Sequence, residues 1–321
     1  MTTHKREVVK MDIKKRNDYV NHLYGACHTL SGKAEFVDIK AAGHEEIVKT
    51  CYRKYDKGKN RHYMYLQLNP NKVIPNSMLK TFKEFEFVLD MALKRIRARG
   101  FSPTRIDMSF NSDHEDDYEL FKKLNRLLIC CIASAYNIKN CYQTSDLWTY
   151  ESLSIAVKND SIEAENYNKE KEAKGQVDTK NRLEFRSKRL RPESNMIDEF
   201  CVKWFERLDK AIQQFQTVQD RYNDELSKIW LKDRCKPDKE RTYLSYTDFI
   251  LKYRDCIFTR KQLEALLDKM GIENSTTKAK NFKKRHTIEF YSLTDLKIIV
   301  KAIKDTTLMY FYGTSALQKA S

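Results

Sequence analysis

The stretch LSIAVKNDSIEAENYNKEKEAKGQVDTKNRLEFRSKRL, residues 153–190, decides the fold. Two runs of alternating apolar and polar residues, 153–158 and 161–167, flank an Asn-Asp pair. This pattern is typical of a β-hairpin with a two-residue turn. A third alternating run, residues 182–188, follows a polar loop. The stretch therefore predicts three neighbouring strands of one sheet.

The alternation also assigns side chains to the two faces of that sheet, because successive residues of a strand point to opposite sides. One face receives apolar side chains such as Ala164 and Phe185. The other receives a tyrosine, carboxylates and arginines, namely Glu163, Glu165, Tyr167, Arg182, Glu184 and Arg186. A solvated polar face is the simpler interpretation of these strands alone. The alternative is a site for chemistry on a phosphodiester.

Composition bounds the class of protein. The chain has 321 residues, of which 41% are hydrophobic, enough for one large domain or two smaller ones. A formal net charge of +15 favours a polyanionic partner, with nucleic acid ahead of an anionic membrane surface. The longest apolar run, 127–135, is too short to span a bilayer, and the N-terminus lacks the apolar segment of a signal peptide. Eight cysteines without a CxxC motif indicate reduced thiols in a cytoplasmic protein.

The first 192 residues predict a basic arm, residues 1–34, followed by a domain over 35–192. The domain is expected to be α+β, a mainly antiparallel sheet with helices packed on one face. Its polar face is expected to be open and to carry Tyr63, Tyr65 and Asp107 besides Tyr167 and Glu184. The expected elements before the hairpin are a short strand at 35–40, a charged loop, a strand at 62–68, a helix ending near Arg99, a strand at 101–110 and a helix at 117–136.

The remainder of the chain predicts helices. Residues 193–231 form a long helix whose apolar stripe suits either packing on the first domain or a homodimer, and 232–242 form a linker. Residues 243–313 predict a helical DNA-binding domain, a helix-turn-helix or winged variant. Its expected elements are a helix capped by Thr259 and ended by Gly271, a basic helix from Ser275, a short strand at 287–291 and a helix from Leu293.

The basic helix is the candidate DNA-contacting element of this domain. Its cationic side chains are expected on DNA phosphates or in a groove, and they are Lys278, Lys280, Lys283, Lys284 and Arg285. A lysine-rich helix face exposed to solvent is the alternative. The basic charge of the whole chain favours DNA.

The segments TRIDMSF, ENYNKEKE and NRLEFRSKRL, in this order and spacing, carry a family resemblance. With YMYLQLNPNKVI upstream of a long helix, they make residues 60–190 resemble the Rep_trans family of rolling-circle plasmid replication initiators. The same segments are similar to MobT-type relaxases of integrative conjugative elements. The last third of the chain resembles the family only loosely.

The resemblance implies a site. Tyr167, in Tyr167-Asn168-Lys169, matches the tyrosine that attacks DNA in the family, and Asp107 and Glu184 match acidic residues of a metal-dependent site. The implied cofactor is Mg²⁺ or Mn²⁺, bound by carboxylate oxygens. Lys169, Arg182 and Arg186 are expected to neutralise phosphate oxygens or to lower the pKa of the phenol.

The implied activity is nicking and rejoining of one DNA strand at an origin. Such a reaction leaves a 5′-phosphotyrosyl link and a 3′-OH that primes replication. The partners implied are origin or transfer-origin DNA and a host helicase. A MobT-type conjugative relaxase and a non-enzymatic DNA-binding initiator or repressor are the alternatives. An RNA-binding protein is compatible with an aromatic sheet face, but the chain lacks an RNP-like motif.

Overall fold

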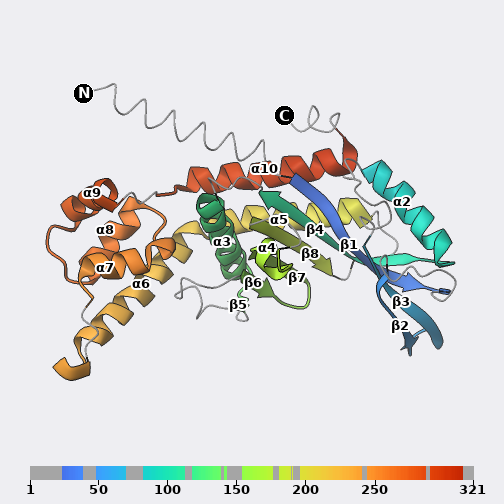
Figure 1. Cartoon of the computed structure of the whole chain (residues 1–321), viewed down its shortest axis with the longest axis horizontal. Helices are drawn as coiled ribbons and strands as arrows, with labels where there is room; N and C mark the ends of the chain where they lie inside the picture. The colour runs from blue at the N-terminus through green and yellow to red at the C-terminus, as the bar shows by residue number, and fades with distance from the viewer. Residues whose placement is uncertain are drawn as a thin grey trace.

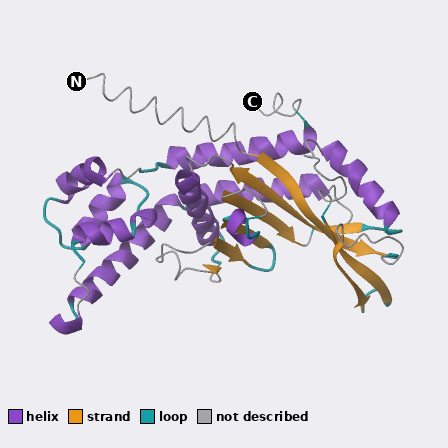
Figure 2. Ribbon diagram, in the orientation of Figure 1, coloured by secondary structure: helices purple, strands orange, loops and turns teal. Residues whose placement is uncertain are grey.

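The computed structural model describes residues 24–38, 48–69, 82–112, 118–138, 141–142, 154–175, 181–188, 190, 196–240, 244–286 and 290–313. Within these ranges the protein is α+β, with one antiparallel sheet packed against helices (Figure 1, Figure 2). The strands are β1 (Tyr24–Ala34), β2 (Val48–Asp56), β3 (Arg61–Leu68), β4 (Ser102–Ser112), β5 (Cys141–Tyr142), β6 (Ser154–Lys158), β7 (Ile162–Tyr167) and β8 (Asn181–Lys188). Their order across the sheet is β2-β3-β1-β4-β8-β7-β6-β5.

The predicted hairpin is confirmed, and its turn explains why it forms there. The side-chain oxygen of Asn159 accepts hydrogen bonds from the backbone N–H groups of Ser161 (2.9 Å) and Ile162 (2.7 Å). An asparagine that closes its own turn in this way favours a tight reversal between β6 and β7. The strand predicted at 182–188 is confirmed as β8, which pairs with both β7 and β4.

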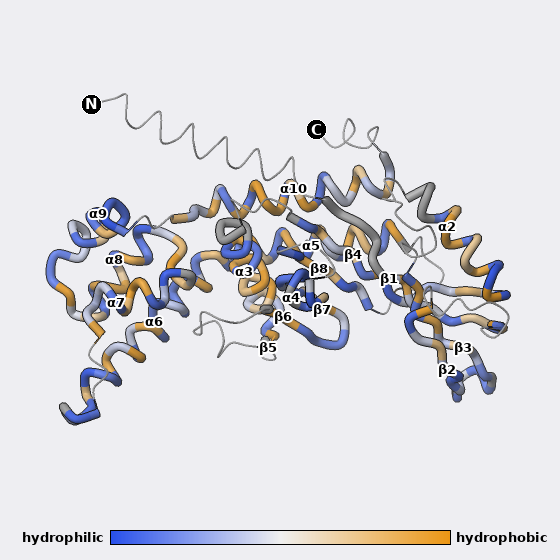
Figure 3. Tube along the Cα trace, in the orientation of Figure 1, coloured by the Kyte–Doolittle hydropathy of each residue, from blue (hydrophilic) through white to orange (hydrophobic). Residues whose placement is uncertain are grey.

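Helices cover one face of the sheet and bury its apolar side chains. They are α2 (Phe82–Arg95), α3 (Tyr118–Ala135), α5 (Met196–Gln213) and α10 (Leu293–Tyr312). The Phe185 ring on β8 stacks on Trp204 of α5, with ring centroids 4.4 Å apart. Hydrophobic and hydrophilic residues alternate along α5 and α10, as expected for helices with one buried stripe (Figure 3). The expected arrangement, helices on one face of an antiparallel sheet, is confirmed.

The N-terminal part of the chain differs from the sequence-based expectation. Residues 24–34 were expected within a basic arm, yet they form β1, which lies between β3 and β4 inside the sheet. The charged loop expected after residue 40 contains the edge strand β2. Residues 35–38 of the expected strand at 35–40 make only an isolated bridge, between Phe36 and Arg99, and residues 39–40 lie outside the described ranges.

The single long helix expected at 193–231 is two helices, α5 and α6 (Phe215–Arg234), which meet at Gln214. Their apolar stripe is used within the chain, because Trp204, Leu208 and Leu226 are buried in its own core. The homodimer expectation therefore loses the surface on which it depended. In the described part of the chain, no helix has both the length and the apolarity needed to cross a bilayer.

The last third contains α7 (Tyr246–Lys252), α8 (Arg260–Lys269) and α9 (Ser275–His286), grouped beside α6 (Figure 1). The predicted caps are confirmed: the Thr259 hydroxyl accepts from Gln262 N at 3.1 Å, and Ser292 forms a capping box with Asp295 at the start of α10. Most of the strand expected at 287–291 lies outside the described residues, and Phe290 and Tyr291 are not in a strand. The helix that closes the chain, α10, returns to pack on β1, α2, α3 and α5.

Candidate functional site

Strand pairing arranges polar side chains in cross-strand rows on the face of the sheet opposite Trp204. Each row takes one residue from β4, one from β8 and one from β7. The rows are Asp107, Arg186 and Glu163; then Ser109, Glu184 and Glu165; then Asn111, Arg182 and Tyr167. The face assignment made from sequence alternation is therefore confirmed for Asp107, Tyr167 and Glu184.

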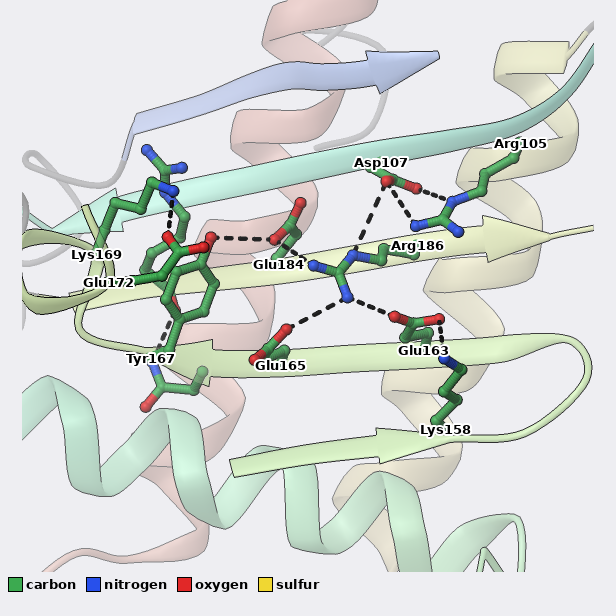
Figure 4. Close-up of polar contacts among 12 residues, drawn as sticks. Arg105, Asp107, Lys158, Glu163, Glu165, Tyr167, Lys169, Glu172, Glu184 and Arg186 are labelled. Atoms are coloured by element: carbon green, nitrogen blue, oxygen red, sulfur yellow. Dashed lines mark hydrogen bonds and ion pairs between the residues drawn. The ribbon is translucent and has the colours of Figure 1, made fainter. Parts of the chain in front are cut away.

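Arg186 lies at the centre of four carboxylates, and we call these five residues the Arg186 cluster (Figure 4). Its Nη2 is 2.9 Å from Glu184 Oε2, and its Nη1 pairs with Glu163 and lies 3.3 Å from Glu165 Oε2. Its Nε is 3.8 Å from Asp107 Oδ2. Burial lowers the pKa of Arg186, but the four carboxylates outweigh it and raise that pKa overall. The guanidinium therefore stays charged and holds the carboxylates together.

Two carboxylates of the cluster have a second cationic partner. Asp107 accepts both a 2.6 Å bond from Arg105 Nε and a 2.7 Å bond from Arg105 Nη2, a bidentate pair. Burial nevertheless raises the pKa of Asp107, against the opposing effect of Arg105. Glu163 pairs with Lys188, and although burial raises its pKa, Lys188 and Arg186 lower it to about 2.

Tyr167 ends β7 beside the cluster. Its side chain is 9% exposed, and its hydroxyl donates to Glu184 Oε2 at 3.3 Å. Burial and the negative charge of Glu184 raise the pKa of Tyr167, and nearby Arg182 offsets only part of that. Arg182 therefore lowers the pKa of this phenol as expected, but desolvation and the Glu184 carboxylate outweigh it and the net shift is upward.

Lys169 is held near Tyr167 by the short helix α4 (Lys169–Glu172), which begins one residue after Asn168. The turn of this helix brings the Lys169 ammonium back to 5.8 Å from the centroid of the Tyr167 ring. The same ammonium pairs with Glu172. Lys169 is thus a neighbour of the phenol ring, but its charge is shared with a carboxylate.

The carboxylates have the donor chemistry that Mg²⁺ or Mn²⁺ prefers. Their arrangement does not fit a metal, because the guanidinium of Arg186 fills the position among them. Both oxygens of Asp107 are hydrogen-bonded to Arg105, and Glu184 Oε2 is shared by Tyr167 and Arg186. Across the described ranges, no group of three or more His, Cys, Asp or Glu side chains is placed to hold a metal ion.

The candidate DNA-contacting residues lie on α9, away from the Arg186 cluster (Figure 1). This helix buries Ala279 and Phe282 against the C-terminal helices. Its exposed side carries Lys280, Lys283, Lys284 and Arg285, while Lys278 is half-buried with its ammonium 5.4 Å from the centroid of the Tyr246 ring. The structure therefore contains two separate groups of predicted site residues.

Sequence reasoning gave no role to Arg105 and Lys188, which neutralise Asp107 and Glu163. The alternation along each strand does place both on the polar face, so the signal was present. What the sequence lacks is the register between strands, which brings Lys188 within reach of Glu163 on a different strand. No protein-family model matches the chain, and no curated protein matches it.

Proposed function

We propose that this protein is a DNA nicking-closing enzyme that uses Tyr167 as its nucleophile, a rolling-circle replication initiator in the class that its strand motifs resemble. The observation that carries the proposal is the 3.3 Å hydrogen bond from the Tyr167 hydroxyl to Glu184, next to Arg182 and Arg186. A phenol held against a carboxylate, with guanidinium groups beside it, combines a nucleophile, a base and anion-stabilising groups.

The reaction follows from these groups. The Tyr167 oxygen attacks the phosphorus of a DNA phosphodiester while its proton passes to Glu184. The new bond joins the tyrosine oxygen to the 5′ phosphate, and the broken bond releases the 3′ oxygen, which takes up a proton. Because the pKa of the phenol is raised, a hydrogen-bonded base is needed to ionise it at neutral pH. Arg182 and Arg186 are suited to offset the charge that develops on the phosphate oxygens.

We propose in addition that the C-terminal helices recognise duplex DNA. Helices α8 and α9 are joined by a short turn through Gly271 and Asn274, both with positive φ, and they pack on one another. We propose that they act as a helix-turn-helix-like module with α9 on the DNA. Its exposed lysines and Arg285 suit contacts to phosphates, which give sequence-independent affinity.

Two other functions stand beside this one. A MobT-type relaxase requires the same strand cleavage and differs in the DNA site and partner proteins, so the site chemistry is common to both. A DNA-binding initiator or repressor without enzymatic activity requires only the basic surface. The contact between Tyr167 and Glu184 favours an enzyme, because a purely DNA-binding protein has no use for a phenol paired with a base.

The test is a nicking assay on supercoiled DNA that carries the origin or transfer-origin of the genetic element encoding the protein. Wild type is compared with Tyr167→Phe, with Glu184→Gln, and with Tyr55→Phe as a control hydroxyl on an exposed part of the same sheet. Each protein is assayed with Mg²⁺, with Mn²⁺ and with a chelator. Covalent protein on the 5′ end and polymerase extension from the 3′ end report the two products.

Wild type and Tyr55→Phe are expected to nick and to form the adduct. Tyr167→Phe is expected to bind but not nick, and Glu184→Gln to nick more slowly by a factor of about 10² or more, as when a general base is lost. Adduct formation by Tyr167→Phe would assign the nucleophile to another tyrosine. Binding without nicking by every protein would make this a non-enzymatic DNA-binding protein.

A further inference from the structure

The edge of the sheet formed by β2 and β3 carries aromatic and cationic side chains in two cross-strand rows. One row is Lys33, Tyr65 and Tyr52, and the next is Tyr63 and Lys54. We call these five residues the tyrosine platform. The pairing of Ser31 with both Gln67 and Arg105 puts the platform on the same face of the sheet as the Arg186 cluster.

The side chains of the platform contact one another; Tyr52 and Lys54 are exposed, and Lys33, Tyr63 and Tyr65 are half-buried. The rings of Tyr52 and Tyr65 have centroids 5.0 Å apart, and the Lys54 ammonium lies within 6 Å of both, at 5.7 and 5.9 Å. The Lys33 ammonium lies 4.4 Å from the centroid of the Tyr63 ring. Tyr52 is 44% exposed. On the opposite face of β3, Leu66 and Leu68 are fully buried in the core.

Charge around the platform favours an anionic occupant. Residues 48–69 contain six lysines and arginines against one carboxylate, Asp56. The turn between the strands presents Lys57 and Lys59 to solvent. Solvent-accessible aromatic rings interleaved with lysines are features by which proteins bind single strands: bases stack on the rings and ammonium groups neutralise phosphates.

We infer that the tyrosine platform binds single-stranded DNA. The bases would stack on Tyr52 and Tyr65, and the phosphates would lie near Lys33 and Lys54. Duplex DNA is a poor occupant, because its bases are already stacked on one another. The choice of DNA over RNA rests on the proposed function, since the platform shares its face with Tyr167.

Fluorescence anisotropy with labelled oligo(dT) of about 12 nucleotides, a length typical of single-strand sites, measures this binding directly. The full-length protein is used without divalent metal, so that no cleavage is required and the result is independent of Tyr167. The test variant is Tyr52→Ala/Tyr65→Ala. The matched control is Tyr55→Ala, an exposed tyrosine on the same strand that pairs with His62 and so faces the other side of the hairpin.

The double alanine variant is expected to bind oligo(dT) at least about tenfold more weakly, since stacking on one aromatic side chain is worth about 1–3 kcal/mol. Tyr55→Ala is expected to bind like wild type. Tyr52→Phe/Tyr65→Phe, which keeps both rings, is expected to retain affinity and covers the case in which the alanine variant fails to fold. Lys33→Ala/Lys54→Ala is expected to reduce the slope of log affinity against log salt by about 1.4, at about 0.7 per phosphate.

Several results would overturn the inference. Wild-type affinity in the double alanine variant, or in the double lysine variant with an unchanged salt slope, would show that the platform is not the binding surface. An equal loss in Tyr55→Ala would mean that the whole hairpin, rather than this face, is responsible. Tighter binding of oligo(rU) than oligo(dT), lost in the same variants, would assign the platform to RNA.

Discussion

At the scale of single residues, Arg186 is the charge that makes four carboxylates on one sheet face compatible with folding. Glu184 is 2% exposed and Asp107 is 3% exposed, so water does not solvate either carboxylate. Removing one partner from a buried ionic network leaves the others uncompensated, which costs about 3–5 kcal/mol. Arg186→Gln is therefore expected to be destabilised by about 3 kcal/mol at pH 7 in urea unfolding.

The pH dependence of that loss has a definite sign. In wild type, the pKa of Glu163 is about 2 in the folded state, below its unfolded value of about 4.3, so its contribution is present above pH 4.3 and lost toward pH 2. Without Arg186 the pKa of Glu163 rises, and the pKa values of Asp107 and Glu165, which burial already holds above their ordinary values, rise further. Their penalty is then largest at neutral pH and is relieved as the pH falls toward 4.3.

The difference in stability between wild type and Arg186→Gln should therefore shrink from pH 7 to pH 4.5. Mn²⁺ should stabilise Arg186→Gln more than wild type, because the position among the oxygens is vacated. Lys94→Gln, which removes the partner of Asp90 in an ion pair exposed on α2, serves as the control and should change little. A difference independent of pH and of Mn²⁺ would mean that Arg186 stabilises the sheet by packing alone.

At the scale of elements, we propose that α9 is the helix that binds duplex DNA. Lys280 and Lys284 are exposed and four residues apart, so they lie one above the other on the helix. Lys280→Ala/Lys284→Ala is expected to weaken binding to duplex DNA and to reduce its salt slope by about 1.8, at about 0.9 per phosphate. The matched control is Lys297→Ala/Lys301→Ala, two exposed lysines at the same spacing on α10. Equal loss in both variants, measured by anisotropy at several salt concentrations, would reduce the effect to net charge.

Elements with a regular pattern could be predicted from the sequence, and those without one could not. The hairpin and β8 alternate without interruption, and their register is regular. In β1 one residue more than in β4 lies between Cys27 and Thr29, so the alternation of β1 is broken there and the segment resembles an arm. Strand β2 is rich in lysine and arginine because it lies at the sheet edge, where charge opposes unwanted pairing, and it therefore resembles a loop.

The candidate site could be predicted in part for the same reason. Alternation within one strand decides the face, which is why Tyr167, Glu184 and Asp107 were correctly grouped. It says nothing of which residue lies opposite across the sheet. The central position of Arg186 and the pairing of Glu163 with Lys188 depend on the register of β7 against β8. Burial of the polar face, which sets the direction of the pKa of Tyr167, also arises only when the strands are assembled.

At the scale of the whole molecule, the C-terminal helices are not a separate appendage. The segment α7–α9 lies between α6 and α10 in the sequence, and α10 returns to pack on the first part of the chain. Lys304 on α10 is 2.6 Å from Asp209 on α5, and Phe311 packs edge-on against Phe200. An amphipathic pattern predicts a helix but not the element on which it packs. For this reason the sequence analysis assigned α10 to a second domain. The long contact along α5 and β1 instead couples both parts.

Lys123 on α3 also joins the sheet-bearing part of the chain to the C-terminal helices, and this contact can be tested. Its buried ammonium donates to the carbonyl oxygens of Arg254 (2.7 Å) and Ile257 (2.9 Å), which follow α7. Lys123→Met keeps the length of the side chain but leaves two carbonyls without this donor, at a cost of about 1–3 kcal/mol for each buried group. The free energy of unfolding in urea should fall by about 2–4 kcal/mol, whereas Lys228→Met, at an exposed site on α6, should change it by less than about 0.5 kcal/mol.

The transition should remain single, because α6 and α10 still join the two parts, while hydrogen exchange should accelerate in α7 and in residues 254–257. Faster exchange confined to those residues, with unchanged global stability, would show that α7–α9 opens locally and independently of the sheet. Unchanged exchange and unchanged stability would mean that solvent satisfies both carbonyls and that apolar packing alone holds the C-terminal helices. A single transition with reduced stability would instead mean that α7–α9 unfold together with the sheet that carries Tyr167, because Lys123 joins them to α3 and α3 packs on β7 and β8.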